Sequence, residues 1–154
     1  MTSAPEMPKV VLDSSTLISA FLTPQGTCAE VLRRAQGHYE LCLSDEIMAE
    51  TASSLLHDEK SQARYGYERE EVEKFILALD AAATIVSELP QERMVPNDPK
   101  DDIIIGTALR AEAQFVITGD RNHLLVLGEY QDIAIITPRQ FLDMLDQGHQ
   151  EKAA

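Results

Sequence analysis

Short apolar runs rich in β-branched residues recur along the chain, and longer segments with apolar residues three or four positions apart lie between them. The short runs are typical of buried strands, and the longer segments are typical of amphipathic helices. The pattern predicts strands at residues 9–13, 39–44, 84–89, 114–120 and 133–137. It predicts helices at residues 14–22, 27–36, 45–58, 68–83, 98–112 and 138–147, a loop or frayed helix end at 58–67, and a short helix or turn at 121–130.

The predicted strands alternate with helices, and several of them are apolar throughout, which indicates a parallel sheet covered by helices on both faces. A chain of 154 residues fits one domain. We expect that domain at residues 9–147, with a flexible leader at 1–8 and a flexible tail at 148–154. No apolar run reaches the roughly 18 residues of a membrane span, and the N-terminus lacks the basic and apolar regions of a secretory signal. Cys28 and Cys42 are expected to be reduced thiols, so we expect a cytoplasmic protein without membrane contact.

The charge balance is strongly acidic, with 26 Asp and Glu residues against 13 Lys and Arg residues and a net charge of −13. Such a charge repels nucleic acid unless local groups reverse it. It is consistent with solubility alone, with acids clustered to hold cations, or with a basic partner protein.

Several acids end predicted strands or begin predicted helices. Asp13 lies at the carboxyl end of the first predicted strand, Asp120 lies at the carboxyl end of the fourth, and Glu50 lies in the helix after the second. Asp101 and Asp102 lie in the first turn of the helix that leads into the fourth strand. In a parallel α/β sheet all these positions lie at the edge formed by the carboxyl ends of the strands. Close carboxylates repel each other unless they share a proton or hold a cation, and oxygen ligands alone match Mg²⁺ or Mn²⁺.

Each acid also has a simpler explanation. Asp98 before Pro99 is typical of a helix N-cap, and Asp13 before a Ser/Thr-rich helix start is an N-cap or a site residue. Asp101 suits the helix dipole, and Asp102 and Glu50 are consistent with solvated acids. Asp120 after a glycine is consistent with a turn. Next to these acids, Ser14 and Thr118 are candidates to orient a carboxylate by hydrogen bonding, and Lys100 and Arg121 are the basic residues nearest to them.

The residues that carry these acids resemble the PIN domain family. KVVLDSSTLISAFL is similar to the opening motif of a strand, an Asp, a polar turn and an apolar helix, and LSDEIMAET is similar to the second motif, with its Glu at Glu50. DPKDDIIIGTALRAEAQFVITGD resembles the third and fourth motifs. IAIITPRQFLDML resembles the ending of the VapC-like branch, which is described as the toxin component of toxin–antitoxin systems.

The resemblance implies a three-layer α/β/α sandwich with a central parallel five-stranded sheet. It implies an Mg²⁺- or Mn²⁺-dependent endoribonuclease, with RNA as substrate, an antitoxin protein as partner and a homodimeric state. Carried over, the catalytic and metal-binding acids are Asp13, Glu50, Asp102 and Asp120, and either Asp101 or Asp102 is the third acid. Ser14 and Thr118 would orient them, and Arg121 and Lys100 would bind the substrate.

Other classes fit the sequence less well. A haloacid dehalogenase phosphatase needs a second Asp two positions after the first, where this chain has Ser15. A receiver domain needs a Lys after a late strand, and here the last predicted strand ends in Thr137 and is followed by Pro138. The main alternative is a PIN-fold protein with weak or no catalysis that acts by binding protein or RNA.

Overall fold

The computed structural model describes residues 7–90, 99–119 and 124–153. Its sheet is formed by β1 (Lys9–Leu12), β2 (Glu40–Ser44), β3 (Thr84–Val86), β4 (Phe115–Ile117), β5 (Glu129–Tyr130) and β6 (Ile133–Ile136). Its helices are α1 (Ser14–Leu22), α2 (Thr27–Arg33), α3 (Asp45–His57), α4 (Glu59–Tyr65), α5 (Arg69–Ala82), α6 (Pro99–Ala111), α7 (Leu124–Leu127) and α8 (Pro138–Ala153).

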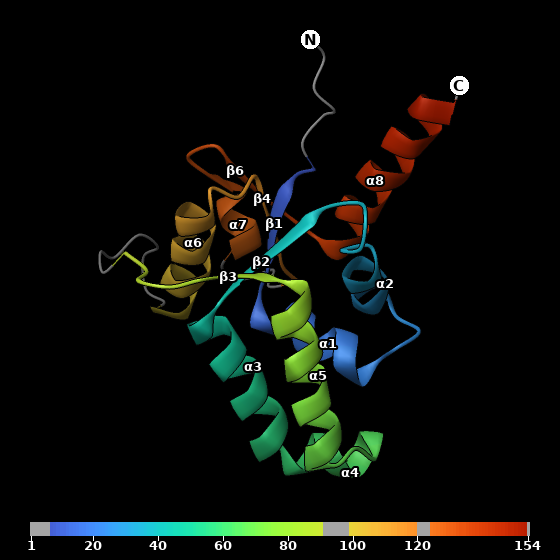
Figure 1. Ribbon diagram of the computed structural model, residues 1–154, viewed down its shortest axis with the longest axis vertical. Helices are drawn as coiled ribbons and strands as arrows, with labels where there is room; N and C mark the ends of the chain where they lie inside the picture. The colour runs from blue at the N-terminus through green and yellow to red at the C-terminus, as the bar shows by residue number, and fades with distance from the viewer. Residues whose placement is uncertain (1–6, 91–98, 120–123, 154) are drawn as a thin grey trace.

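The strands lie in the order β3-β2-β1-β4-β6-β5, and every pair is parallel except β5 with β6. Helix α6 lies on one side of the sheet, and α2 and α8 lie on the other (Figure 1). The predicted sandwich of three layers is therefore confirmed. In the central strand, Val10, Val11 and Leu12 have no exposed surface. This explains its unbroken apolar sequence, because both of its faces are covered.

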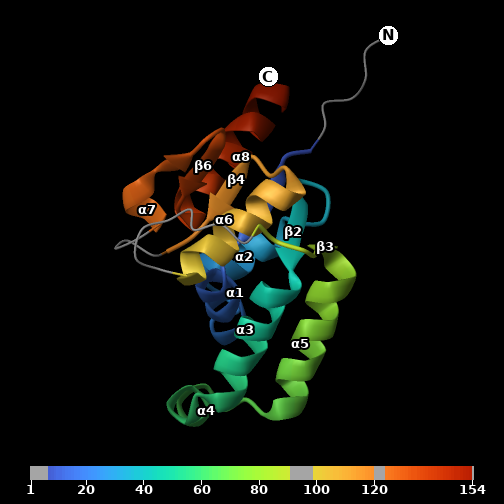
Figure 2. The ribbon, with the colours of Figure 1, turned by 90° about the vertical axis from the view of Figure 1, so that its left-hand side faces the viewer.

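Helices α3 and α5 lie side by side and project from the sheet, with α4 at their far end (Figures 1 and 2). A separate small core of Leu55, Tyr67 and Val72 joins them, and Phe21 of α1 packs against it. No helix in the described part of the chain has the length and apolar character needed to cross a membrane.

The structure corrects the expected strand number and the expected loop. The sheet of the described residues has six strands rather than five, because Glu129–Tyr130 forms the two-residue strand β5. The segment 58–67 contains helix α4, which Asp58 begins by accepting from Ser61 N at 3.1 Å and Gly66 ends with a φ of 66°. No residue of α4 is buried, so an apolar periodicity had no reason to appear there.

The structure describes more of the expected C-terminal tail than of the expected N-terminal leader. Residues 1–6 of the expected leader lie outside the described residues, and β1 begins at Lys9. Helix α8 continues to Ala153 through the segment in which a flexible tail was expected. The domain bounds 9–147 stay a prediction.

Candidate functional site

The carboxyl ends of β1 and β4 meet at the point where the strand order reverses. β1 continues to β2 on one side, and β4 lies on its other side with Leu12 opposite Ile117. The backbone N–H of Asp13 donates to Ile117 O at 3.2 Å, which places Asp13 and Thr118 level with each other just beyond the two strands. Ligands of parallel α/β proteins bind at such a reversal.

Three hydrogen bonds fix the carboxylate of Asp13, which is 5% exposed. Its Oδ1 accepts from Thr16 N at 2.8 Å and from Ser15 Oγ at 3.0 Å, and its Oδ2 accepts from Thr118 Oγ1. The bond from Thr16 N makes Asp13 the N-cap of α1, so the cap explanation and the site position apply to the same residue. Thr118 and Ser15 therefore both donate to Asp13, and the orienting roles expected for Thr118 and Ser14 stay predictions.

Helix α6 brings its first turn to the same edge. Gln114, just after this helix, accepts from Lys9 N at 2.8 Å and donates its own N–H to Lys9 O at 2.9 Å. The end of α6 therefore lies at the amino edge of the sheet, and its beginning points to the carboxyl edge. Within that first turn Asp101 is 5% exposed and Asp102 is half-buried. The two candidates for the third acid therefore differ in burial, and the choice between Asp101 and Asp102 stays open.

Glu50 of α3 contacts the first turn of α6. Its Oε1 lies 3.4 Å from Lys100 Nζ, and the exposed fractions of the two side chains are 26% and 75%. Lys100, a predicted substrate-binding residue, therefore has a carboxylate of the proposed site as its neighbour. The contact shows that the middle of α3 and the first turn of α6 lie together.

Three predicted positions cannot be placed: Asp98, Asp120 and Arg121 lie outside the described residues. Within residues 7–90, 99–119 and 124–153, no group of three or more His, Cys, Asp or Glu side chains is arranged to hold a metal ion. The described acids therefore share one edge of the sheet without forming a complete ligand cluster by themselves.

The sequence model for the PIN domain matches residues 9–122. That span is well over half of the 154 residues. The chain belongs to the PIN domain family. The match includes every position predicted for the acidic site, from Asp13 through Arg121.

Solved structures share this PIN fold at low sequence identity. VapBC2 from Rickettsia felis, bound to a DNA fragment from their promoter, has a TM-score of 0.58 at 13% identity, covering 84% of this chain and 98% of that one. PAE2754 from Pyrobaculum aerophilum has a TM-score of 0.60 at 15% identity, covering 91% and 90%. FitAB bound to an IR36 DNA fragment has a TM-score of 0.51 at 21% identity, covering 84% and 94%. A comparison with curated proteins finds no match.

Cys28 of α2 lies close enough to the acidic edge of the PIN domain for the charge of Asp13 to affect the pKa of its thiol. Burial raises the pKa of the Cys28 thiol, the negative charge of Asp13 raises it further, and a hydrogen bond with Ser19 acts in the opposite direction. The neutral thiol is therefore favoured beside Asp13.

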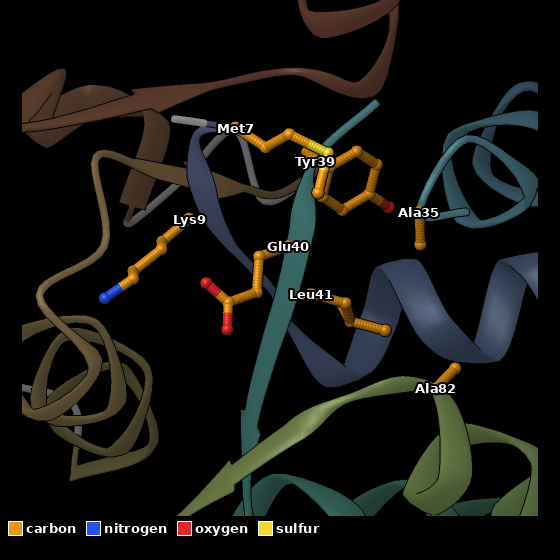
Figure 3. Close-up of a pocket in the computed structure, with 7 residues that line it drawn as sticks. All are labelled: Met7, Lys9, Ala35, Tyr39, Glu40, Leu41 and Ala82. Carbon is orange, nitrogen blue, oxygen red and sulfur yellow. The ribbon is translucent and has the colours of Figure 1, made fainter. Parts of the chain in front are cut away.

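A pocket of about 530 Å³ lies away from this edge (Figure 3). Lys9 and Glu40, the first residues of β1 and β2, line it together with Tyr39. These residues place the pocket at the amino edge of the sheet. Glu40 accepts from Thr84 Oγ1 at 2.9 Å and Tyr39 donates to Val31 O at 2.7 Å, so both polar groups are used within the fold. We assign the functional site to the acidic edge and not to this pocket.

Proposed function

We propose that this PIN domain is an Mg²⁺- or Mn²⁺-dependent endoribonuclease that hydrolyses RNA phosphodiester bonds. We further propose that it is the toxin of a toxin–antitoxin pair, held inactive by an antitoxin protein, and that it forms a homodimer. Membership of the PIN domain family and the fold shared with VapBC2 and FitAB support this assignment.

One observation carries the proposal: a buried carboxylate, Asp13, is held by three hydrogen bonds at the reversal of the strand order. A carboxylate removed from water is stabilised only by strong partners. Hydrogen bonds to both oxygens fix the direction in which their remaining lone pairs point. A carboxylate fixed in this way is suited to hold a cation rather than to move a proton.

The donor chemistry of the site fits a hard divalent cation. Asp13, Glu50 and Asp101 offer only carboxylate oxygens, which Mg²⁺ and Mn²⁺ prefer over the His and Cys ligands of zinc. Lys100 Nζ, 3.4 Å from Glu50, shows that a positive charge is accommodated there. Asp120 belongs to the proposed ligands through its position in the family motif, with Asp102 beside Asp101. A bound cation would neutralise charge on the phosphodiester and make water a better nucleophile.

The chain's own groups then have separate roles. Asp13 and Asp101 would hold the cation near the end of β1, and Glu50 would contribute a carboxylate from α3. Lys100, which is 75% exposed and lies beside Glu50, is proposed to contact a phosphate of the substrate, and Arg121 is proposed for the same role. Local positive groups are needed because the net charge of −13 repels RNA.

A binding role without catalysis is the second candidate. The observation that favours it is that Asp13 already has a structural role, because its Oδ1 accepts from Thr16 N and caps α1. Under this alternative the acidic edge would bind a basic partner, and Asp13 would serve only as the cap of α1.

The test is cleavage of a mixed single-stranded RNA pool in Mn²⁺ or Mg²⁺ by wild type and by Asp13→Asn. Asn is as good an N-cap as Asp, so the variant should keep α1. Asp80→Asn is the matched control, because Asp80 is exposed on α5. We expect metal-dependent cleavage in wild type and Asp80→Asn and its loss in Asp13→Asn. Equal cleavage in all three proteins, or none in wild type alongside no effect of metal on its melting temperature, would favour the binding role.

A further inference from the structure

Two fully buried hydroxyl groups join the helices that carry the acids. Ser44, the N-cap of α3, and Thr107, in the middle of α6, both have no exposed surface, and their oxygens lie 2.8 Å apart. Ser44 Oγ also accepts from Ile47 N at 3.3 Å, and Thr107 Oγ1 lies 2.7 Å from Ile103 O. One arrangement satisfies all three contacts: Ser44 accepts from Ile47 and donates to Thr107, which donates to the Ile103 carbonyl.

Packing alone does not require a hydroxyl at this place. The neighbours of Thr107 on the buried face of α6 are apolar, among them Ile104, Ala108 and Ala111. A valine would occupy the same volume. A buried hydroxyl is costly unless it is hydrogen-bonded, so the contact with Ser44 gives the position its chemical meaning.

The Ser44–Thr107 contact lies at a fixed distance along the helices from two of the proposed ligands, Glu50 and Asp101. Helix α3 leaves the sheet at the end of β2, whereas α6 returns towards the amino edge, so the two helices run in opposite directions past the contact. Glu50 lies six residues after Ser44, and Asp101 lies six residues before Thr107. At 1.5 Å per residue each acid lies about 9 Å beyond the contact, on the same side of it. The ion pair of Glu50 with Lys100 supports this placement.

We propose that the Ser44–Thr107 hydrogen bond sets the relative height of α3 and α6, so that Thr107 is a positioning residue for the cation-binding acids. The inference rests on the proposed function. A hydrogen bond between short side chains has a preferred length and direction, whereas hydrophobic burial is non-directional, so this bond specifies the offset of the two helices. A shift of one helix along the other would change the separation of Glu50 and Asp101 directly.

The experiment measures the Mn²⁺ concentration that gives half of the maximal rise in melting temperature. Thr107→Val, which keeps the volume and removes the hydroxyl, is expected to raise this concentration about tenfold or more, as the loss of groups that orient metal ligands does. Thr107→Ser is expected to stay near wild type. In cleavage assays kcat should fall in Thr107→Val while the KM for RNA stays unchanged.

Thr51→Val is the matched control. Thr51 is also fully buried, and its hydroxyl donates to Ile47 O at 2.8 Å, which reproduces the bond of Thr107 within its own helix without a bond to another helix. We expect Thr51→Val to lose stability and to keep the wild-type Mn²⁺ response. A Thr107→Val response equal to that of wild type would overturn the inference, as would an equal loss in Thr51→Val.

Two further comparisons keep the result interpretable. If Thr107→Val does not fold, Thr107→Ala and Thr107→Ser are compared, because both lack the methyl group and they differ only in the hydroxyl. Equal Mn²⁺ responses of this pair overturn the inference. If wild type itself shows no response to Mn²⁺, the proposed metal-dependent function fails together with the inference. A wild-type response that is lost in Asp13→Asn and unaffected by Thr107→Val overturns the positioning role alone.

Discussion

The hydrogen bond from Thr118 to Asp13 predicts a specific loss of stability. Asp13 is 5% exposed, and Thr118, which has no exposed surface, donates to its Oδ2. Replacing Thr118 by valine keeps the volume of the side chain and removes one of the three hydrogen bonds of a buried carboxylate. A hydrogen bond to a charged group contributes about 1.5–3 kcal/mol. For a domain of this size each kcal/mol corresponds to about 2–4 °C, so the melting temperature should fall by about 3–12 °C.

The assay is urea unfolding of metal-free protein at neutral pH. The free energy of unfolding is measured for wild type and four variants: Thr118→Val, Thr51→Val, Asp13→Asn and the double variant Asp13→Asn/Thr118→Val. Thr51→Val removes a buried hydroxyl that donates to a neutral carbonyl, so it should cost only about 0.5–1.5 kcal/mol. In an Asp13→Asn background Thr118→Val should cost about as little as Thr51→Val, because the acceptor is then neutral. If Thr118→Val costs the same with Asp13 as with Asn at that position, the bond has no charge-assisted character and the reasoning is wrong.

Three other predictions follow from single contacts or backbone angles. Lys100→Met should lower the Mn²⁺ concentration needed for stabilisation by up to about fivefold, because its ammonium no longer competes for the carboxylate on α3, and Lys74→Met on α5 should leave that concentration unchanged. Burial raises the pKa of the Cys42 thiol in the folded protein to about 11. The contribution of the neutral buried thiol to the free energy of unfolding is therefore complete below the unfolded pKa of about 8.5. It is lost as the pH rises through about 11. Mass spectrometry should then show that iodoacetamide at pH 8 labels Cys42 only after unfolding, and rapid labelling of native protein would contradict this. Gly66 has a φ of 66°, so Gly66→Ala should reduce the free energy of unfolding by about 1–2 kcal/mol, whereas Gly148→Ala, within α8, should not reduce it.

The main elements were predictable because their physical causes are local. Strand β1 is apolar throughout because both of its faces are covered, and α1 begins where Asp13 can accept from Thr16 N. Asp13 was interpreted as a cap or a site residue, and the structure shows why sequence could not separate the two: the cap of α1 lies at the edge where the strand order reverses.

Other features depend on contacts that sequence does not contain. The serine that donates to Asp13 is Ser15, because the first turn of α1 directs this hydroxyl towards Oδ1. Neighbouring residues on a helix point about 100° apart. Asp101 is therefore buried while Asp102 is only half-buried, a difference that their adjacent positions in the sequence do not reveal. The two-residue strand β5 is too short for an alternating pattern.

The pairing of β1 with β4 affects the order in which contacts form while the chain is synthesised. The contact of Asp13 with Thr118 joins residues 105 positions apart, whereas α3, α4 and α5 follow one another directly in the chain. Contacts between distant residues form later than local ones, because a longer loop must be closed. The projecting helices can assemble while synthesis continues, but Asp13 cannot gain its partner until Thr118 has emerged from the ribosome. A nascent chain therefore lacks the Asp13–Thr118 hydrogen bond until the whole segment between these two residues has been translated and has left the ribosome.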